Sequence, residues 1–164
     1  IMDTFAALAL ASIPPSESVM QAKPRKSSDF IITPTMGWMI FGVGILFACV
    51  LMGMLIAFEH APGGLTVHRL TIFFTFFVML QFWNMFNAKA FMTGRSALAG
   101  LWKSKSFLWV IVLIVVGQYL IVTFGGKMFN VVPLSLNEWL TISAMTMPVL
   151  LFGEIARMTK SRNK

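Results

Sequence analysis

The sequence predicts an all-α fold, an integral membrane helical bundle with four complete transmembrane helices and a truncated half-helix at its N-terminus. Two observations predict it. Only 12% of the residues are charged and 57% are hydrophobic, whereas a soluble domain carries about 25% charged residues. Charges are also absent in blocks, from residues 36–58, 70–88, 106–126 and 139–153. A bilayer core needs roughly 20 apolar residues per helix, so each block predicts one span, the fourth with Glu138 and Glu154 at its ends.

Positive charge alternates with these blocks and thereby predicts the orientation. Of the 13 Lys and Arg residues, all but Arg69 and Lys127 fall in residues 14–34, in residues 89–105 or in the tail after residue 153. Basic loops stay in the cytoplasm, so these segments, including the C-terminus, are predicted to be cytoplasmic, and residues 59–68 and 126–136 to lie outside. A basic surface for nucleic acid would not alternate with apolar spans, so no nucleic acid partner is expected.

The N-terminal segment, residues 1–13, is apolar but short. Pro14 and Pro15 stop any helix, because proline lacks an amide donor and clashes with the preceding turn. At about 1.5 Å per residue the segment reaches about 20 Å, less than the roughly 30 Å of hydrocarbon. Since a basic loop follows it, the segment ends at the cytoplasmic side and its start lies near mid-membrane. The chain begins with Ile1, and we expect a preceding half-helix to be missing.

Asp3 lies at that mid-membrane start and is the sharpest functional candidate. A carboxylate at this depth is costly, and such groups usually face a cavity, a partner or an ion. Calcium and other hard cations prefer carboxylate and carbonyl oxygens. The alternative is that Asp3 only caps a short interfacial helix through nearby backbone amides. The residues by themselves leave both interpretations open.

The second long span carries Gln81, Asn84 and Asn87 at steps of three, which places them in one slanting row on a helix face. In lipid such side chains turn toward other helices and form hydrogen bonds there. Gln81 is the deepest, and it either lends its amide oxygen to an ion or joins helices. Asn84 and Asn87 lie nearer the cytoplasm and are expected to lock helices together.

Five further residues carry structural or functional expectations. Gln118 in the third span is expected to form an interhelical hydrogen bond, and Pro148 to kink the last span. His60 and His68, with Glu59, suggest a metal site, but exposed loop histidines without a ligating role are favoured. The sequence has no glycine-rich phosphate loop of the Walker type.

Several stretches resemble calcium-pumping P-type ATPases, with the plasma-membrane-type branch nearest. Residues 2–11, followed by Pro14-Pro15 and Lys23-Pro24-Arg25, resemble the sixth membrane helix of that family and the loop after it. The order of the other stretches also agrees. Residues 79–88 resemble the eighth helix of that family, residues 124–140 resemble its ninth-to-tenth connection, and residues 148–155 resemble its last helix.

The resemblance implies that the chain is the C-terminal transmembrane fragment of an ATP-driven calcium pump. Residues 1–13 would then be part of helix six, residues 14–34 a cytoplasmic loop, and residues 35–164 the bundle of helices seven to ten with a short tail. It further implies that Asp3 is a Ca²⁺ ligand at mid-membrane. Gln81 stands where two-site pumps have an acidic ligand, and Met2 where they have a threonine, so one ion per cycle is expected.

The resemblance also implies what lies elsewhere in the pump. An asparagine ligand four residues before Asp3, the glutamate of the fourth helix, the phosphorylated aspartate and the nucleotide domain, with Mg²⁺ and ATP, would all be outside these residues. The fragment alone is therefore expected to be no enzyme, whereas its parent chain is expected to be a calcium-transporting ATPase. Expected partners are the remaining membrane helices, the cytoplasmic domains and the lipid bilayer.

Two alternatives to a calcium-pump fragment stay open, and the cellular membrane is also predicted. The chain could be a free-standing four-helix membrane scaffold, or the same region of a pump for Mn²⁺ or Na⁺. Because no calmodulin-binding tail follows Arg157, the bacterial inner (cytoplasmic) membrane is expected.

Overall fold

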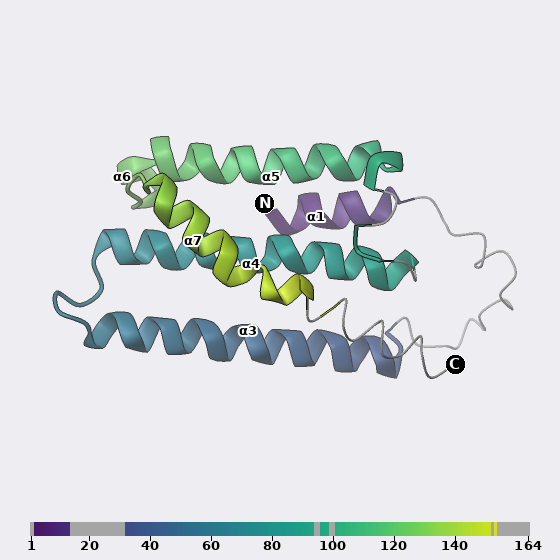
Figure 1. The fold of residues 1–164 in the computed structure, drawn as a ribbon, viewed down its shortest axis with the longest axis horizontal. Coiled ribbons are helices and arrows are strands. Elements are labelled where there is room, and N and C mark those ends of the chain that lie inside the picture. The colour runs from purple at the N-terminus through teal and green to yellow at the C-terminus, as the bar shows by residue number, and fades with distance from the viewer. Residues whose placement is uncertain (1, 14–31, 94–95, 99–100, 152, 154–164) are drawn as a thin grey trace, which may run out of the picture. The chain divides into compact units, whose positions relative to one another are not determined.

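The computed structural model describes residues 2–13, 32–93, 96–98, 101–151 and 153 (Figure 1). All regular elements in those ranges are helical, which confirms the all-α fold. The chain forms two compact units. The first combines Ile1–Pro14 with Leu65–Lys164, and the second is Pro15–Gly64. The predicted loop 14–34, apart from its last three residues, and the tail with Glu154 and Arg157 lie outside the described ranges.

Three helices are long and apolar enough to cross a membrane, namely α3 (Pro34–His60), α4 (Val67–Thr93) and α5 (Lys105–Phe124). They match the first three spans expected from the uncharged blocks. The short helix α1 (Met2–Ala11) ends just before Pro14, as the proline pair predicts. The 3-10 turn η1 (Leu101–Lys103) precedes α5, and the one-turn helix α6 (Gly126–Phe129) follows it.

The fourth expected span, residues 139–153, is not one continuous helix. Helix α7 covers Leu136–Thr146, Met147 forms a turn, and residues 148–151 are helical again. The break lies beside Pro148, whose missing amide and ring remove a helical hydrogen bond. The backbone tightens there, because Leu150 N donates to the carbonyl of Met147 at 2.9 Å, only three residues back. The interruption lies where Pro148 was expected to kink the last span, so the kink expected in residues 139–153 is confirmed.

Unit 2 contains α3, which begins with clear local signals. Thr33 is its N-cap, and its hydroxyl accepts a hydrogen bond from Met36 N at 3.3 Å. Pro34 occupies the first helical position, where its missing amide costs nothing. Large apolar side chains such as Trp38 and Phe41 are exposed, which suits a helix whose surroundings are lipid.

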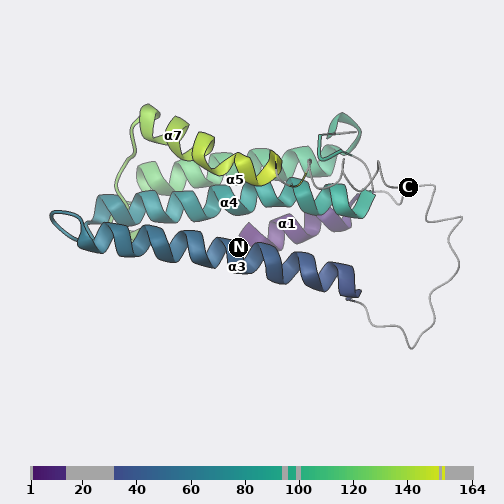
Figure 2. The same ribbon diagram turned by 60° about the horizontal axis from the view of Figure 1, so that its bottom comes forward.

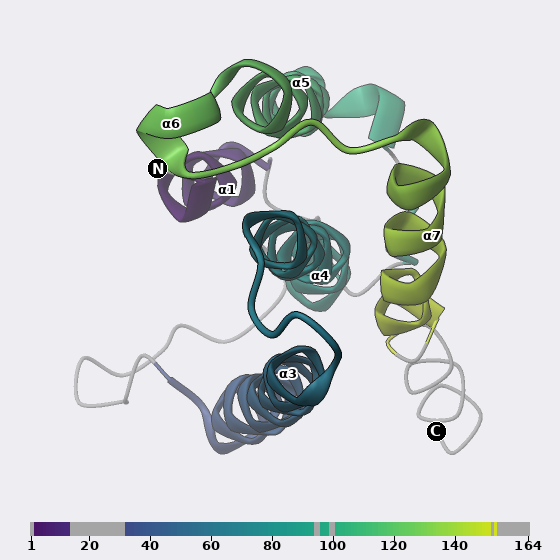
Figure 3. The same cartoon turned by 90° about the vertical axis from the view of Figure 1, so that its left-hand side faces the viewer.

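Unit 1 is organised around α4, which packs against α7, α5 and α1. Figure 3 shows α4 nearly end-on, with α5 and α1 toward one side and α7 toward another. Its core contains an edge-to-face aromatic chain, in which the ring centroids of Phe82 and Phe86 lie 5.4 Å apart and those of Phe86 and Phe107 5.6 Å apart. Phe107 and Val122 on α5 are fully buried. Burial of this kind makes α4 the central support of unit 1.

The connection after α5 depends on left-handed backbone positions. Gly126 has φ +43, and Asn130, which ends α6, has φ +51. Glycine adopts this region without strain, and asparagine tolerates it better than most residues. The chain therefore turns at Gly125-Gly126 after α5 and continues into α6 before it reaches α7.

Candidate functional site

The position of Asp3 is the second residue of α1; its side chain lies outside the described part of the chain. Helix α1 packs against α5 and α4. Figures 1 and 2 both show α1 beginning beside the middle of α4 rather than at either of its ends. The start of α1, the helix that carries Asp3, is therefore level with the middle of α4, the longest helix in unit 1. The role of Asp3 as a cation ligand stays a prediction.

Gln81 lies near the middle of α4 and is half-buried. It belongs to the row formed with Val78 and Met85, since residues three and four apart share a helix face. Both of these neighbours are buried, at 6% and 4% exposure, so Gln81 borders a packed surface. Within the described residues its amide makes no hydrogen bond. The side chain is thus available as a ligand or as an interhelical donor, and both interpretations remain open.

The two histidines of the first predicted outer turn have other partners. His60 Nδ1 lies 2.9 Å from the carbonyl oxygen of Ile56, one turn earlier in α3. His68 Nε2 lies 2.7 Å from Glu138 Oε1. Among the residues that the structure describes, no group of three or more His, Cys, Asp or Glu residues could hold a metal ion.

Polar contacts join α4 to α7 and to the residues after it. Asn87 Nδ2 donates to the carbonyl oxygen of Val149 at 2.8 Å, and its amide lies against Gly153, where a Cβ would meet Asn87 Oδ1. Trp83 Nε1 donates to Thr146 Oγ1 at 3.1 Å, and that hydroxyl donates in turn to the carbonyl of Ile142 at 2.8 Å. Within the described residues half-buried Asn84 makes no such bond. The sequence pointed to Asn87 but gave no sign of the Trp83 contact.

A second set of buried contacts joins α4 to α5 and to the following connection. Gln118 Nε2 donates to Thr75 Oγ1 at 3.4 Å, and both side chains are buried. This confirms the interhelical bond expected of Gln118. Thr71 Oγ1 accepts from Val132 N at 3.1 Å. Sequence analysis missed both threonines, because a threonine in an apolar helix can satisfy its hydroxyl on its own backbone.

Lys89, near the C-terminal end of α4, is only 2% exposed. Its Nζ donates to the carbonyl oxygen of Ala97 at 3.5 Å and lies 5.6 Å from the centroid of the Phe107 ring. A desolvated ammonium over an aromatic face gains from the electrons of the ring. The charge pattern predicts that Lys89 is an ordinary loop cation. In the structure its hydrogen bond to the Ala97 carbonyl instead ties the segment after α4 to the end of that helix.

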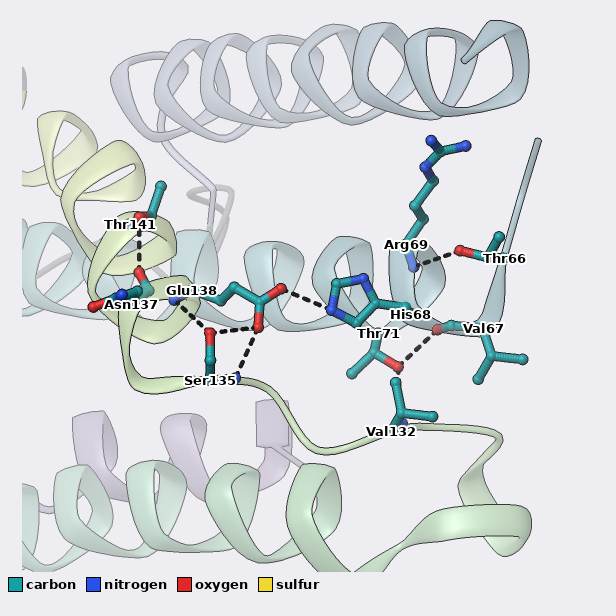
Figure 4. A network of polar contacts seen from close by, with 10 residues as sticks. All are labelled: Thr66, Val67, His68, Arg69, Thr71, Val132, Ser135, Asn137, Glu138 and Thr141. Atoms are coloured by element: carbon teal, nitrogen blue, oxygen red, sulfur yellow. Dashed lines mark hydrogen bonds and ion pairs between the residues drawn. The ribbon is translucent and has the colours of Figure 1, made fainter. Parts of the chain in front are cut away.

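At the opposite end of α4, a network surrounds Glu138 at the start of α7 (Figure 4). Ser135 is the N-cap of α7, and it forms a reciprocal capping box with Glu138. Hydrogen bonds from the Ser135 side chain, and then from its backbone, hold the pKa of Glu138 below its ordinary value, and the charge of His68 acts in the same direction. The carboxylate is therefore fixed on one side by the cap and on the other by His68.

Residues 1–159 match the family described as "Cation transporting ATPase, C-terminus". The chain belongs to this family. It is also similar to plasma membrane calcium-transporting ATPase 2 of Oreochromis mossambicus, with 32% identity over 99% of this chain and 16% of that relative. Plasma membrane calcium-transporting ATPase 1 of Gallus gallus is 33% identical over 94% of this chain, and ATPase 3 of Homo sapiens is 32% identical over 94%.

The chain spans only 14 to 16% of the length of these relatives. Membership of the cation-transporting ATPase C-terminal family confirms the resemblance stated from residues 2–11 and 79–88. It also favours the membrane region of a P-type pump over the free-standing scaffold. The described residues contain three candidate spans, α3 in unit 2 and α4 and α5 in unit 1, which is consistent with a multi-pass membrane protein.

Proposed function

We propose that this chain is the C-terminal membrane region of an ATP-driven calcium pump and that it supplies Asp3 to a mid-membrane site for the transported Ca²⁺. Similarity to plasma membrane calcium-transporting ATPases over 94 to 99% of the chain carries this proposal. The start of α1 beside the middle of α4 supports it, because a carboxylate held at that depth suits an ion on its way across the bilayer.

In the whole pump, the partners of this region are the remaining membrane helices and the cytoplasmic domains, where ATP and Mg²⁺ act. Asp3 binds the ion in the inward-open state, and phosphorylation elsewhere tilts the helices and weakens the site. The loop 14–34 couples the phosphorylation domain to α1. The polar contacts of α4 with α5 and α7 keep the supporting helices together while α1 responds.

The proposed orientation follows the basic segments, so the loop 14–34, residues 89–105 and the C-terminus face the cytoplasm. The first turns of α4 and α7 then face outside. The bacterial inner membrane as the location stays a prediction.

The proposed pump moves one Ca²⁺ per cycle. Asp3 contributes one negative charge, and Gln81 is neutral where a second acidic ligand would be needed. Each further divalent ion held in a low-dielectric site needs compensating carboxylates. Gln81 therefore serves at most as an auxiliary oxygen ligand or packs against a neighbouring helix.

The test is the substitution Asp3→Asn in the full-length protein. Asparagine keeps the size of the side chain and one oxygen but removes the charge. We expect calcium-dependent phosphorylation by ATP to be lost or to require far higher calcium, while ATP binding is retained. Glu59→Gln, near the C-terminal end of α3, also neutralises a carboxylate but lies outside the proposed site and the coupling loop, so it is the control and should behave as wild type.

Unchanged calcium dependence in Asp3→Asn would remove Asp3 from the site. ATPase activity stimulated by Mn²⁺ or Na⁺ instead of Ca²⁺ would assign another cation to the same region.

A further inference from the structure

The first turn of α4 and the start of α7 are joined by a titratable contact. His68, the second residue of α4, places Nε2 2.7 Å from Glu138 Oε1. The two side chains are 49% and 29% exposed, so water and protons reach them. Figure 4 shows the imidazole ring turned toward the carboxylate. This contact plays no part in the proposed cation site near Asp3.

Glu138 is held in place to receive the histidine. Its Oε2 accepts two hydrogen bonds from Ser135, from the backbone N and from Oγ, each at 2.7 Å. The remaining oxygen, Oε1, faces His68. Because the capping bonds stabilise the carboxylate form, the lowered pKa of Glu138 keeps it ionised across the range in which histidine titrates.

A second tie between the same segments does not titrate. Thr71 Oγ1 accepts from Val132 N at 3.1 Å while it donates to the carbonyl of Val67 at 2.8 Å. Residues 132–138 are therefore fastened to the first turns of α4 at two points. Of these two contacts, only the one between His68 and Glu138 joins two titratable side chains.

Few other charged groups lie on the elements that pack here. Apart from His68, the charged or titratable residues on α1, the first turn of α4, α5, α6 and α7 are Asp3, Arg69, Lys105, Tyr119, Lys127 and Glu138. Asp3 belongs to α1, which starts beside the middle of α4, and Lys105 starts α5 at its far end. Tyr119 stacks near Trp139 with ring centroids 6.2 Å apart. Figure 4 shows the Arg69 side chain directed away from His68. Glu138 is therefore the charged group in contact with the imidazole ring.

We propose that His68 and Glu138 form a pH-sensitive clasp that holds the start of α7 to the start of α4 more tightly as the pH falls. Histidine is the side chain whose ordinary titration lies between about pH 5 and 8. With a neutral ring the contact is a hydrogen bond, and with a protonated ring it becomes an ion pair with the fixed carboxylate. In the proposed orientation the clasp lies on the outer side of the membrane and senses the pH of the outer compartment. Only this assignment of the compartment rests on the proposed function.

Hydrogen exchange of the backbone amides in residues 131–142 measures the clasp directly. The full-length protein in lipid nanodiscs is compared with its His68→Gln variant at pH 5.5, 6.5 and 8. The ratio of the two exchange rates at one pH cancels the intrinsic effect of pH on exchange. A partly exposed ion pair is worth up to about 1 kcal/mol, so we expect His68→Gln to exchange about two- to five-fold faster than wild type at pH 5.5 and nearly equally at pH 8.

Three further variants sharpen the experiment. Glu138→Gln should lose the same pH dependence, and adding His68→Gln to it should cause no further change in that dependence, because the two side chains respond to pH through one contact. His60→Gln is the matched control, since His60 contacts only a carbonyl of its own helix, and it should keep the wild-type pH dependence. A ratio for His68→Gln that is the same at all three pH values would overturn the clasp. So would a pH dependence that survives in Glu138→Gln. Neither result bears on calcium-dependent phosphorylation, which tests the proposed function separately.

Discussion

At the scale of residues, the interior of unit 1 is held by polar side chains that reach from one helix to the backbone or hydroxyl of another. Asn87 and Gln118 each make such a bond with a side chain that is at most 7% exposed. In lipid the unpaired alternative is costly, although measured contributions average only about 0.6 kcal/mol and reach about 1.7. Each contact therefore adds a small, directional term to packing that is otherwise apolar.

Asn87→Ala should destabilise the membrane region by about 0.5 to 2 kcal/mol, because it removes the donor to the carbonyl of Val149. Asn84→Ala is the control, since Asn84 lies one turn away, is half-buried and makes no hydrogen bond within the described residues. Denaturation of the full-length protein in detergent, followed by tryptophan fluorescence, compares the two. Equal losses for both variants would show that the Asn87 contact carries no special weight.

Residue-level expectations succeeded where chemistry alone restricts the choices. An amide in an apolar helix gains from a partner on a neighbouring helix, and Gln118 and Asn87 have the partners expected of them, whereas Gln81 and Asn84 form no hydrogen bond within the described residues. Sequence analysis missed Lys89, because a lysine beside a basic loop is indistinguishable in sequence from a solvated one. Only the fold shows that the ring of Phe107 and the carbonyl of Ala97 lie over it. Two side chains far apart in the chain leave no local signal of their meeting.

At the scale of elements, α7 shows how local sequence defines a helix that hydropathy describes incompletely. The capping box of Ser135 and Glu138 starts it, and it ends at Thr146, two residues before Pro148. The uncharged block 139–153 predicted the span and Pro148 its interruption, whereas the capping box moves the start of the helix to Leu136, three residues before the block. The start follows a capping signal, and the interruption follows a missing amide.

Ser135→Ala should destabilise α7 by about 1 kcal/mol, the usual cost of losing an N-cap hydroxyl. Ser104→Ala is the matched control, because Ser104 is the N-cap of α5 but makes no side-chain capping bond. Exchange rates of the first-turn amides of each helix measure the effect. An equal change at both caps would contradict the importance of the Ser135 bond.

Ser135→Ala should also change how the stability of α7 depends on pH. Since the pKa of Glu138 is lowered in the folded protein, its contribution to stability is present above the ordinary pKa of a glutamate. That contribution is lost as the pH falls through the lowered value. Ser135→Ala removes the largest cause of the shift, so the contribution should be smaller and its loss should be complete at a higher pH than in wild type. Exchange in the first turn of α7, followed from neutral to acid pH, detects it.

At the scale of the whole molecule, the order and type of helices were accessible from the sequence, because uncharged blocks of bilayer length need no tertiary information. Three of the four expected spans match α3, α4 and α5. The cation site was not accessible in the same way. The chain covers 14 to 16% of the length of its relatives, and in the proposed pump the other ligands come from helices outside it. Asp3 was therefore indicated by its charge, its depth and the resemblance of residues 2–11, and not by a set of neighbouring ligands.

The proposed orientation predicts which connections a membrane-impermeant thiol reagent reaches. In a Cys49→Ala background, Leu65→Cys in the connection before α4 should be labelled in intact cells, because the basic segments lie on the other side. Leu98→Cys, equally apolar and also exposed, should be labelled only after the membrane is permeabilised. The opposite pattern would invert the orientation.

The central claim is that this region helps to hold a single transported Ca²⁺ through Asp3. Equilibrium binding of radioactive calcium to the full-length protein, counted per phosphorylation site, tests it most directly. We expect one calcium ion per phosphorylation site in the wild-type protein and none at the same calcium concentration in Asp3→Asn. Two ions per site, or undiminished binding by Asp3→Asn, would contradict it.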